Sequence, residues 1–162
     1  MQTTYWMAAI GFALCAGLWV LARRRRGKLQ PTAARRRIVV DGTNVMFWHD
    51  NTAKLSTLKS VVGALRRRNL DPVVFLDASS RHHLGDRSLD AVKFARVLGL
   101  RADRVVVCPA RTEADAFLLD YARRNRLAVV SNDRFRDRPR AARNLRLVGG
   151  YVANGRVRLK GL

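Results

Sequence analysis

Acidic residues are scarce in this sequence. Only 12 of its 162 residues are Asp or Glu, against 32 Lys or Arg, which gives a formal net charge of +20. Such a charge disfavours a cationic partner and favours a polyanion, either nucleic acid or an anionic lipid surface. An arginine-rich and alanine-rich composition is also typical of a GC-rich genome, so the charge alone does not decide the function.

Cysteine is scarce as well. The two cysteines, Cys15 and Cys108, stand far apart, one in an apolar segment and the other at the end of a β-branched run. A structural zinc site needs four Cys or His ligands in paired clusters, and this sequence has no such spacing. We therefore expect neither a zinc site nor a disulfide, and a domain suited to the reducing cytoplasm.

Charge is missing altogether from one segment near the N-terminus. Residues 4–22, TYWMAAIGFALCAGLWVLA, make about 19 uncharged residues, which at 1.5 Å rise nearly span a bilayer core of roughly 30 Å. A cleaved signal peptide would begin with positive residues, and none precedes this segment. Arg23–Arg26 follow it directly, and a basic block on this side places the rest of the chain in the cytoplasm. We predict a single-pass transmembrane anchor over residues 1–22, in a bacterial inner (plasma) membrane.

The remainder of the chain divides into a linker and one domain. Residues 23–35 are polar and basic, and we expect Arg23–Arg26 to contact anionic lipid headgroups. From residue 36 to residue 162 the length suits one folded domain of ordinary size.

Short β-branched runs alternate with helix-like segments in this domain. The runs are RIVVD, PVVFLD, RVVVCP and LAVVSND, and the helical patterns lie near residues 52–68, 88–98 and 112–125. Strands that are apolar on both faces and separated by helices predict a mainly parallel sheet covered on both sides, an α/β fold. Asn154-Gly155 between two alternating runs predicts a C-terminal β-hairpin.

Half of the few carboxylates stand where such a sheet would bring them together. Ligands bind beyond the carboxyl ends of parallel strands. The six candidates directly follow an apolar run, open the helix after the third run, or lie four residues beyond the last run: Asp41, Asp77, Asp133, Glu113, Asp115 and Asp137. Clustered carboxylates repel one another unless a cation neutralises them, and all-oxygen ligands suit Mg²⁺ or Mn²⁺. Taken one at a time, each of these residues is equally consistent with a turn or a helix cap.

The first apolar run leads into a turn with the sequence VVDGTNV, residues 39–45. Turns of this kind also occur in phosphoryl-transfer sites and in nucleotide-binding sites. A phosphatase of the haloacid-dehalogenase type needs the motif D-x-D-G-T, and here Val39 occupies the position of the nucleophilic aspartate. The turn also lacks the glycine-rich loops of dinucleotide-binding and P-loop proteins. Covalent phosphoryl transfer and nucleotide binding are therefore both disfavoured.

Three blocks in order resemble the NYN domains of the PIN-like nuclease superfamily, in particular the bacterial relatives of regnase-like ribonucleases. The blocks are VVDGTNV at 39–45, TEADAFLLDYA at 112–122 and VVSNDRFRD at 129–137. The resemblance implies a three-layer PIN-like fold that uses Mg²⁺ or Mn²⁺. It implies a catalytic, metal-binding centre of Asp41, Asp115 and Asp133, with further metal ligation by Asp137 and Glu113 and support from Asn44, Ser131, Asn132 and Asp77.

This sequence departs from the family pattern in the second block. Regnase-like enzymes have adjacent aspartates there, whereas Asp115 stands between Ala114 and Ala116. Either Glu113 supplies the missing oxygen, or the site holds metal less tightly.

The resemblance implies hydrolysis of RNA phosphodiester bonds by a metal-activated water. Five arginines near the acidic blocks are candidates for holding the RNA backbone: Arg111, Arg134, Arg136, Arg138 and Arg140. Phe47 and Trp48 offer rings for stacking on an unpaired base, which favours single-stranded RNA, although packing in the core accounts for at least one of them.

Three hypotheses follow. The first is a membrane-anchored, metal-dependent endoribonuclease. The alternative is a catalytically weak RNA-binding or scaffold protein of the same fold, which the atypical second block favours. In the third, the arginines bind anionic lipid and the acidic residues only stabilise turns.

Overall fold

The computed structural model describes residues 35–162. The predicted membrane anchor, residues 1–22, and all but the last residue of the predicted linker, 23–35, lie outside the described residues. Among the helices of residues 35–162, none is both long enough and apolar enough to cross a membrane.

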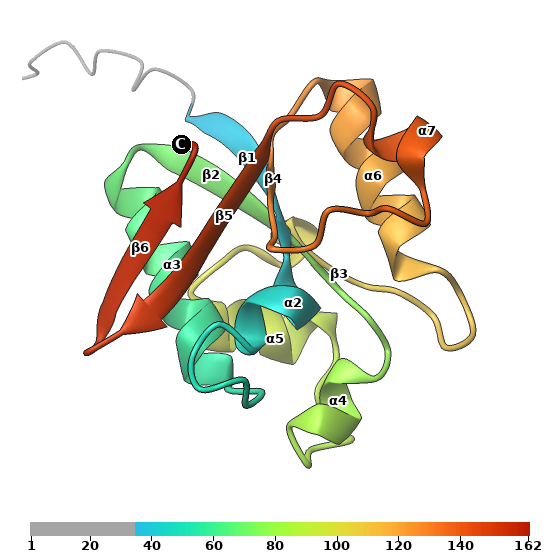
Figure 1. Ribbon diagram of the computed structural model, residues 1–162. Helices are drawn as coiled ribbons and strands as arrows, with labels where there is room; N and C mark the ends of the chain where they lie inside the picture. The colour runs from blue at the N-terminus through green and yellow to red at the C-terminus, as the bar shows by residue number, and fades with distance from the viewer. Residues whose placement is uncertain (1–34) are drawn as a thin grey trace, which may run out of the picture. The chain divides into compact units, whose positions relative to one another are not determined.

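A six-stranded sheet forms the centre of the fold (Figure 1). Its strands are β1 (Arg36–Asp41), β2 (Leu70–Leu76), β3 (Val105–Val107), β4 (Val129–Val130), β5 (Leu147–Ala153) and β6 (Arg156–Lys160). They lie in the order β3-β2-β1-β4-β5-β6, and every neighbouring pair is parallel except β5 and β6. The predicted mainly parallel α/β sheet is confirmed.

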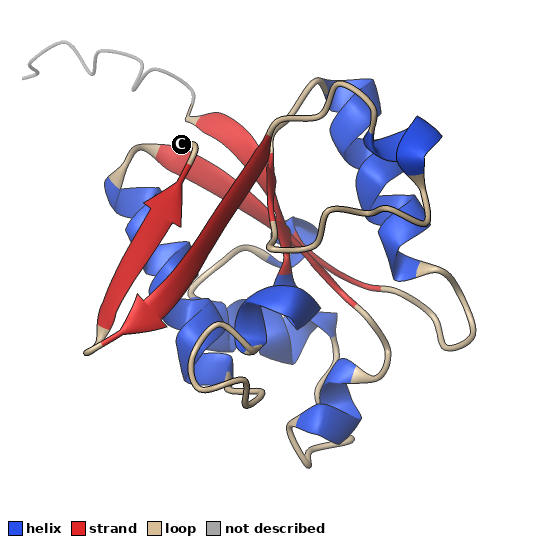
Figure 2. Cartoon of the chain, in the orientation of Figure 1, coloured by secondary structure: helices blue, strands red, loops and turns tan. Residues whose placement is uncertain are grey.

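Helices connect the strands and cover the sheet (Figure 2). They are α2 (Gly42–Met46), α3 (Leu55–Arg67), α4 (Ser80–His83), α5 (Ala91–Leu98), the 3₁₀ turn η1 (Ala102–Arg104), α6 (Ala114–Asn125) and α7 (Pro139–Ala142). The three long helices correspond to the three predicted patterns, although each begins two or three residues later than the pattern did. The short helices α2, α4 and α7 were not predicted.

The order of the strands reverses beside β1. From β1 the chain moves to β2 and β3 on one side, and it then returns to β4 on the other side of β1. At such a point the connections after β1 and β4 leave in opposite directions, and the carboxyl ends of the two strands border a crevice. Asp41 is the last residue of β1, so its side chain lies at this reversal.

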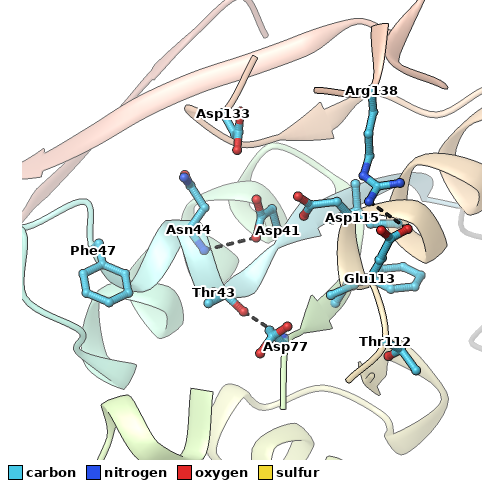
Figure 3. A pocket seen from close by; sticks show the side chains of 13 residues that line it. Asp41, Thr43, Asn44, Phe47, Asp77, Thr112, Glu113, Asp115, Asp133 and Arg138 are labelled. Atoms are coloured by element: carbon cyan, nitrogen blue, oxygen red, sulfur yellow. Dashed lines mark hydrogen bonds and ion pairs between the residues drawn. The ribbon is translucent and has the colours of Figure 1, made fainter. Parts of the chain in front are cut away.

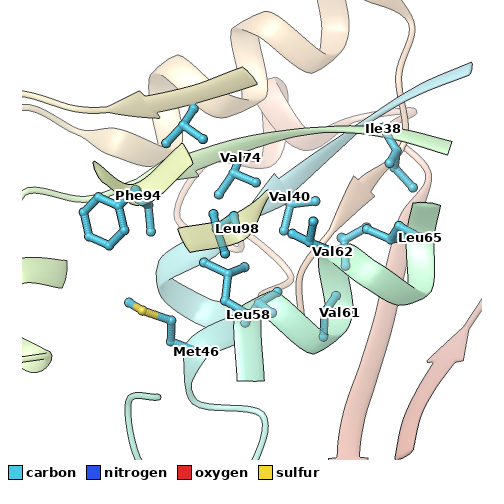
Figure 4. Packing of buried hydrophobic residues seen from close by; sticks show 14 of the residues in the cluster. Ile38, Val40, Met46, Leu58, Val61, Val62, Leu65, Val74, Phe94 and Leu98 are labelled. Carbon is cyan, nitrogen blue, oxygen red and sulfur yellow. The ribbon is translucent and has the colours of Figure 1, made fainter. Parts of the chain in front are cut away.

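Two hydrophobic clusters hold the layers together. Successive residues of a strand face opposite sides of a sheet, and Val39 and Val40 accordingly enter different clusters. The Val40 cluster fills the space under α2, α3 and α5 (Figure 4). The Val39 cluster includes Leu119 of α6 and Phe135. Both clusters and all six strands lie within residues 35–162, which form one compact unit.

The predicted C-terminal hairpin is confirmed. Ala153 pairs with Arg156, and the two residues between them have positive φ, 49° at Asn154 and 67° at Gly155. Left-handed backbone at both positions is the geometry that matches the twist of antiparallel strands, and Asn and Gly adopt it at the least cost.

Candidate functional site

A pocket of about 420 Å³ opens at the carboxyl ends of β1, β2 and β4 (Figure 3). Its lining includes residues of all three sequence blocks, residues at the end of β2, and two residues just beyond the blocks, Phe47 and Arg138. The full lining is Asp41, Thr43, Asn44, Phe47, Phe75, Asp77, Thr112, Glu113, Ala114, Asp115, Leu118, Asp133 and Arg138. Five of the six predicted carboxylates are among them. The sixth, Asp137, is outside the lining and is exposed.

Asp41 is the most deeply buried carboxylate of the pocket. Only 8% of its surface is exposed. Its Oδ1 accepts a hydrogen bond from the backbone N–H of Asn44 at 3.1 Å, and its Oδ2 accepts one from the Ser131 hydroxyl at 2.8 Å. Burial raises the pKa of Asp41 to about 6, because these two hydrogen bonds offset only part of the desolvation. The same bond to Asn44 caps α2, so this residue both closes a turn and faces the pocket.

Asp133 is joined to Asp41 through one hydroxyl. The backbone N–H of Asp133 donates to Ser131 Oγ at 3.0 Å, and that hydroxyl donates to Asp41. Asp133 Oδ1 in turn accepts from the N–H of Phe135 at 2.7 Å. Phe135 is fully buried although its φ is 49°, an unusual backbone for an aromatic residue, so its ring anchors the loop in a strained turn.

Asp115 enters the pocket from the first turn of α6. Burial raises its pKa, and the nearby carboxylates of Asp133 and Asp137 raise it further. The capping residue of α6 is Glu113, whose side chain makes no capping hydrogen bond, and Thr112 donates its hydroxyl to the carbonyl of Pro109 at 2.6 Å.

Glu113 forms an ion pair with Arg138 at the rim of the pocket. The distance between Arg138 Nη2 and Glu113 Oε2 is 2.8 Å, and Arg138 Nε lies 3.5 Å from Asp137 Oδ2. Hydrogen bonding to Arg138 lowers the pKa of Glu113 and raises that of Arg138. The guanidinium therefore joins the start of α6 to the loop that carries Asp133 (Figure 3).

Asn44 and Asn132 tie together the three chain segments behind the carboxylates. Asn44 Oδ1 accepts from the Trp48 indole at 2.9 Å and from the backbone N–H of Asn132 at 3.0 Å. The Asn132 amide makes a pair of bonds with the backbone of Gly150 in β5, at 2.8 and 2.9 Å. A Cβ on Gly150 would overlap the Trp48 ring, so only glycine permits this approach. The sequence indicated the two asparagines but gave no sign of the parts played by Trp48 and Gly150.

Asp77, at the end of β2, makes local turn contacts. Its Oδ1 accepts from the N–H of Ser79 at 2.6 Å, and its own N–H donates to Thr43 Oγ1 at 2.8 Å.

Of the two predicted stacking rings, Phe47 lines the pocket, with its ring edge-on to His83 at 5.4 Å between centroids. Trp48 is the ring that packs in the core.

Only one of the five predicted RNA-binding arginines lines the pocket, and that is Arg138. The other four are exposed and lie outside the lining: Arg111, Arg134, Arg136 and Arg140.

The donor set limits the kind of metal ion that fits. Within residues 35–162, no three His, Cys, Asp or Glu side chains are arranged to enclose a metal ion. Mg²⁺ binds through one or two carboxylates and keeps several of its own waters, so a hydrated hard cation does not need such an enclosure. The buried Asp41 and the mutually repelling Asp115 and Asp133 fit that mode, because a cation would relieve both the desolvation and the repulsion.

Comparisons with known proteins agree with this geometry. The family model described as "Zc3h12a-like Ribonuclease NYN domain" matches residues 34–148, a range that includes all three sequence blocks. None of the curated proteins compared matches the chain.

Two solved structures share the fold. A crystal structure of nuclear proteinaceous RNase P 2 (PRORP2) from A. thaliana has a TM-score of 0.59 and 20% identity, over 76% of this chain and 29% of that one. A second structure, of Arabidopsis thaliana nuclear protein-only RNase P 2, has a TM-score of 0.57 and 19% identity, over 99% and 37%. This chain thus spans about a third of the length of those proteins.

Proposed function

We propose that this chain, which belongs to the Zc3h12a-like ribonuclease NYN domain family, is a metal-dependent endoribonuclease that hydrolyses phosphodiester bonds in single-stranded RNA. The observation that carries the proposal is the convergence of Asp41, Asp115 and Asp133 on one pocket, in a chain whose net charge is +20. Burial and the neighbouring carboxylates raise the pKa of Asp41 and of Asp115, so the ionised forms of these groups are disfavoured where they stand. A site that requires negative charge explains their placement.

The pocket can hold a divalent cation and orient a water molecule. Asp41, Asp115 and Asp133 are the residues that would hold Mg²⁺ or Mn²⁺, which when bound neutralises phosphate charge and makes a bound water more acidic. Ser131 and the Asn44 N–H keep the Asp41 carboxylate in one orientation. Asp115 and Asp133 are better exposed. Their carboxylate oxygens that do not hold the cation would accept hydrogen bonds from the attacking water and aim it at phosphorus. The chemistry requires no covalent intermediate.

Arg138 and Phe47 would bind the substrate on either side of the acids. Arg138, held in place by Glu113, would donate from its remaining N–H groups to the non-bridging oxygens of a phosphate. The Phe47 ring lines the pocket and would stack on an unpaired base. The exposed arginines near the site would add phosphate contacts that weaken as salt rises.

The test is cleavage of a labelled single-stranded RNA by the full chain, purified in an uncharged detergent, in Mn²⁺ and in chelator. The Asp41→Asn variant should lose cleavage, and calorimetry should show that it also loses Mn²⁺ affinity. Asp120→Asn is the matched control, because Asp120 pairs with Arg124 at 2.8 Å on the outer surface of α6. Unchanged cleavage by Asp41→Asn in a clean preparation would refute the proposal.

Anchoring to a bacterial inner membrane through residues 4–22, with the catalytic domain in the cytoplasm, is the second part of the proposal. The uncharged stretch and the arginine block that follows it support this part. The full chain should stay with membranes after alkaline carbonate washing, and a chain that lacks residues 4–22 should be released. Release of the full chain would refute the anchor without affecting the nuclease proposal.

A catalytically weak RNA-binding or scaffold protein is the competing function. The pairing of Arg138 with Glu113 favours it, because a guanidinium at the rim already offsets part of the charge that a metal would neutralise. RNA binding that persists in chelator, with no turnover in any divalent metal, would establish this alternative.

A further inference from the structure

A second pocket, of about 450 Å³, lies at the opposite ends of the same strands. It surrounds the start of β1, the first residue of β2, the residues before β4 and β5, and the end of α6. Its lining residues are Arg36, Arg37, Ile38, Leu70, Arg123, Arg126, Leu127, Ala128, Arg143, Asn144, Leu145, Arg146 and Leu162. Six are arginines and none is acidic. We call it the arginine pocket.

Half of these arginines have no partner within residues 35–162. Arg146 donates to the Gly161 carbonyl at 3.0 and 2.7 Å, Arg37 reaches the Tyr121 hydroxyl at 3.5 Å, and Arg123 lies 3.9 Å from Asp120. The side chains that form neither an ion pair nor a hydrogen bond with any described residue are Arg36, Arg126 and Arg143. Six exposed guanidinium groups around one pocket, with no acidic side chain among them, make a positive surface that attracts anions.

The end of α6 explains part of this charge but not all of it. Basic residues in the last turn of a helix interact favourably with its carbonyl end, and Arg123 and Arg126 stand there. Arg36 belongs to a strand and Arg146 to a loop, where no helix end requires them, and Arg143 follows α7, which has only four residues. Three separate chain segments therefore bring arginine to one place.

The position of the pocket indicates which anion it meets. Arg36 opens β1, so the chain enters the domain at this pocket. A linker over residues 23–35 is at most about 45 Å long when fully extended, at roughly 3.3–3.6 Å per residue. If residues 4–22 span a bilayer, the arginine pocket belongs to the end of the domain that the linker holds near the headgroups.

The acidic pocket lies at the far end of the strands. A strand of seven residues, such as β2, is about 23 Å long at roughly 3.3 Å per residue. An anionic surface attracts the end that carries six arginines more strongly than the end where the carboxylates offset the nearby arginines. This orientation leaves the acidic pocket open to the cytoplasm.

We infer that the arginine pocket binds the anionic headgroups of the membrane and so seats the domain with its acidic pocket facing away from the bilayer. The inference rests on the membrane location proposed above and not on nuclease activity. The arginine pocket, rather than Arg23–Arg26 alone, would then sense the anionic lipid content of the bilayer.

Hydrogen–deuterium exchange of the full chain in vesicles tests the inference directly. The chain is reconstituted into phosphatidylcholine vesicles with and without phosphatidylglycerol. We expect phosphatidylglycerol to slow amide exchange in residues 123–128 and 143–147 by at least about threefold, because a bound headgroup opposes local opening. The loop at residues 131–137, beside the acidic pocket, should show no such change.

Two triple variants that remove the same charge distinguish lipid binding at this pocket from a general effect of the protein's positive charge. Arg36→Gln/Arg126→Gln/Arg143→Gln should abolish the slowing. Arg67→Gln/Arg156→Gln/Arg158→Gln removes equal charge from a groove between α3 and β6, and in this variant the slowing of exchange by phosphatidylglycerol should remain. Exchange in the core strands shows whether each variant is folded.

Two results would overturn the inference. One is slowing that survives in the first triple variant. The other is protection of the same segments by single-stranded RNA in chelator but not by phosphatidylglycerol, which would make the pocket an RNA site. Neither readout depends on cleavage or on carbonate washing, so failure here is distinguishable from failure of the proposed function or of the anchor.

Discussion

The two ends of the parallel sheet carry opposite charge and hold it in different ways. At the carboxyl ends, Asp41 and Asp133 are each tied by short hydrogen bonds to backbone N–H groups, and the Ser131 hydroxyl joins them. At the amino ends, three of the six arginines bind nothing among residues 35–162. The acidic end is fixed in place before any ligand arrives, whereas the arginines of the other end are long and exposed.

This difference suits two kinds of ligand. A reacting phosphate must be held to within a fraction of an ångström, so its site is built from short, restrained side chains. A bilayer surface presents many interchangeable anions, so flexible arginines serve as well as ordered ones. We therefore expect single substitutions to be severe at the acidic end and mild at the arginine end.

Substitution of a pocket carboxylate should have the largest effect, and Asp115→Asn is the substitution with a matched control on the same helix. We expect cleavage to fall about a hundredfold to a thousandfold, which is within the range expected for losing a group that accepts a proton or hydrogen bond from the attacking water. Asp120→Asn makes the same change five residues later on α6 and should stay within about twofold of the wild type. Equal losses in the two variants, measured as kcat/KM on one RNA, would mean that position on the helix does not matter.

Substitution of Phe135 should loosen the loop that carries Asp133. Phe135→Ala removes a fully buried ring that anchors the Asp133 loop, and it should lower the free energy of unfolding by about 3–5 kcal/mol. Phe117→Ala, at a ring that is 52% exposed, should cost less than about 1 kcal/mol. Urea unfolding of both variants measures the difference, and similar losses would argue against Phe135 as the anchor.

Asp41→Asn should make the metal-free protein more stable while making it inactive. The folded state raises the pKa of Asp41 from 3.8 to about 6, so the folded state binds this proton more tightly than the unfolded state does. The resulting loss of stability develops as pH rises from about 4 to about 6, and it is complete above that range.

The variant lacks that loss and should be about 1–3 kcal/mol more stable at pH 7 in chelator, with no advantage at pH 3. Thermal unfolding at the two pH values measures this. Mg²⁺ should raise the Tm of the wild type only. A variant less stable than the wild type at pH 7 would show that the ionised Asp41 carboxylate does not destabilise the folded state.

The smallest expected effect distinguishes two roles for Glu113. If it holds Arg138 in place for the substrate, Glu113→Gln should raise KM about twofold to threefold and leave kcat nearly unchanged, as expected for an exposed ion pair. If it is a metal ligand, the Mn²⁺ concentration needed for half-maximal rate should rise instead. A titration of rate against Mn²⁺ at saturating RNA separates the two roles.

The sequence predicted the acidic end far better than the arginine end. Aspartates directly after apolar runs indicated the crevice, and the match of residues 34–148 confirms the resemblance to NYN domains. Trp48 and Gly150 were missed because their contact joins positions about a hundred residues apart and no local pattern reports it. The arginine pocket was missed for the same reason. In the sequence its arginines stand far apart: Arg36 at the start of a strand, Arg126 at the end of a helix and Arg143 in a loop. Only the folded sheet brings them together.

The most direct test of the central claim is cleavage of a fluorescent single-stranded RNA by the full chain, with Mn²⁺ or with chelator, beside Asp133→Asn. Asp133 is exposed, so this substitution should leave the fold intact. We expect cleavage in Mn²⁺ that disappears both in chelator and in the variant. Cleavage that persists in either, or salt-sensitive RNA binding without any cleavage, would contradict a metal-dependent nuclease site at the carboxyl ends of the sheet.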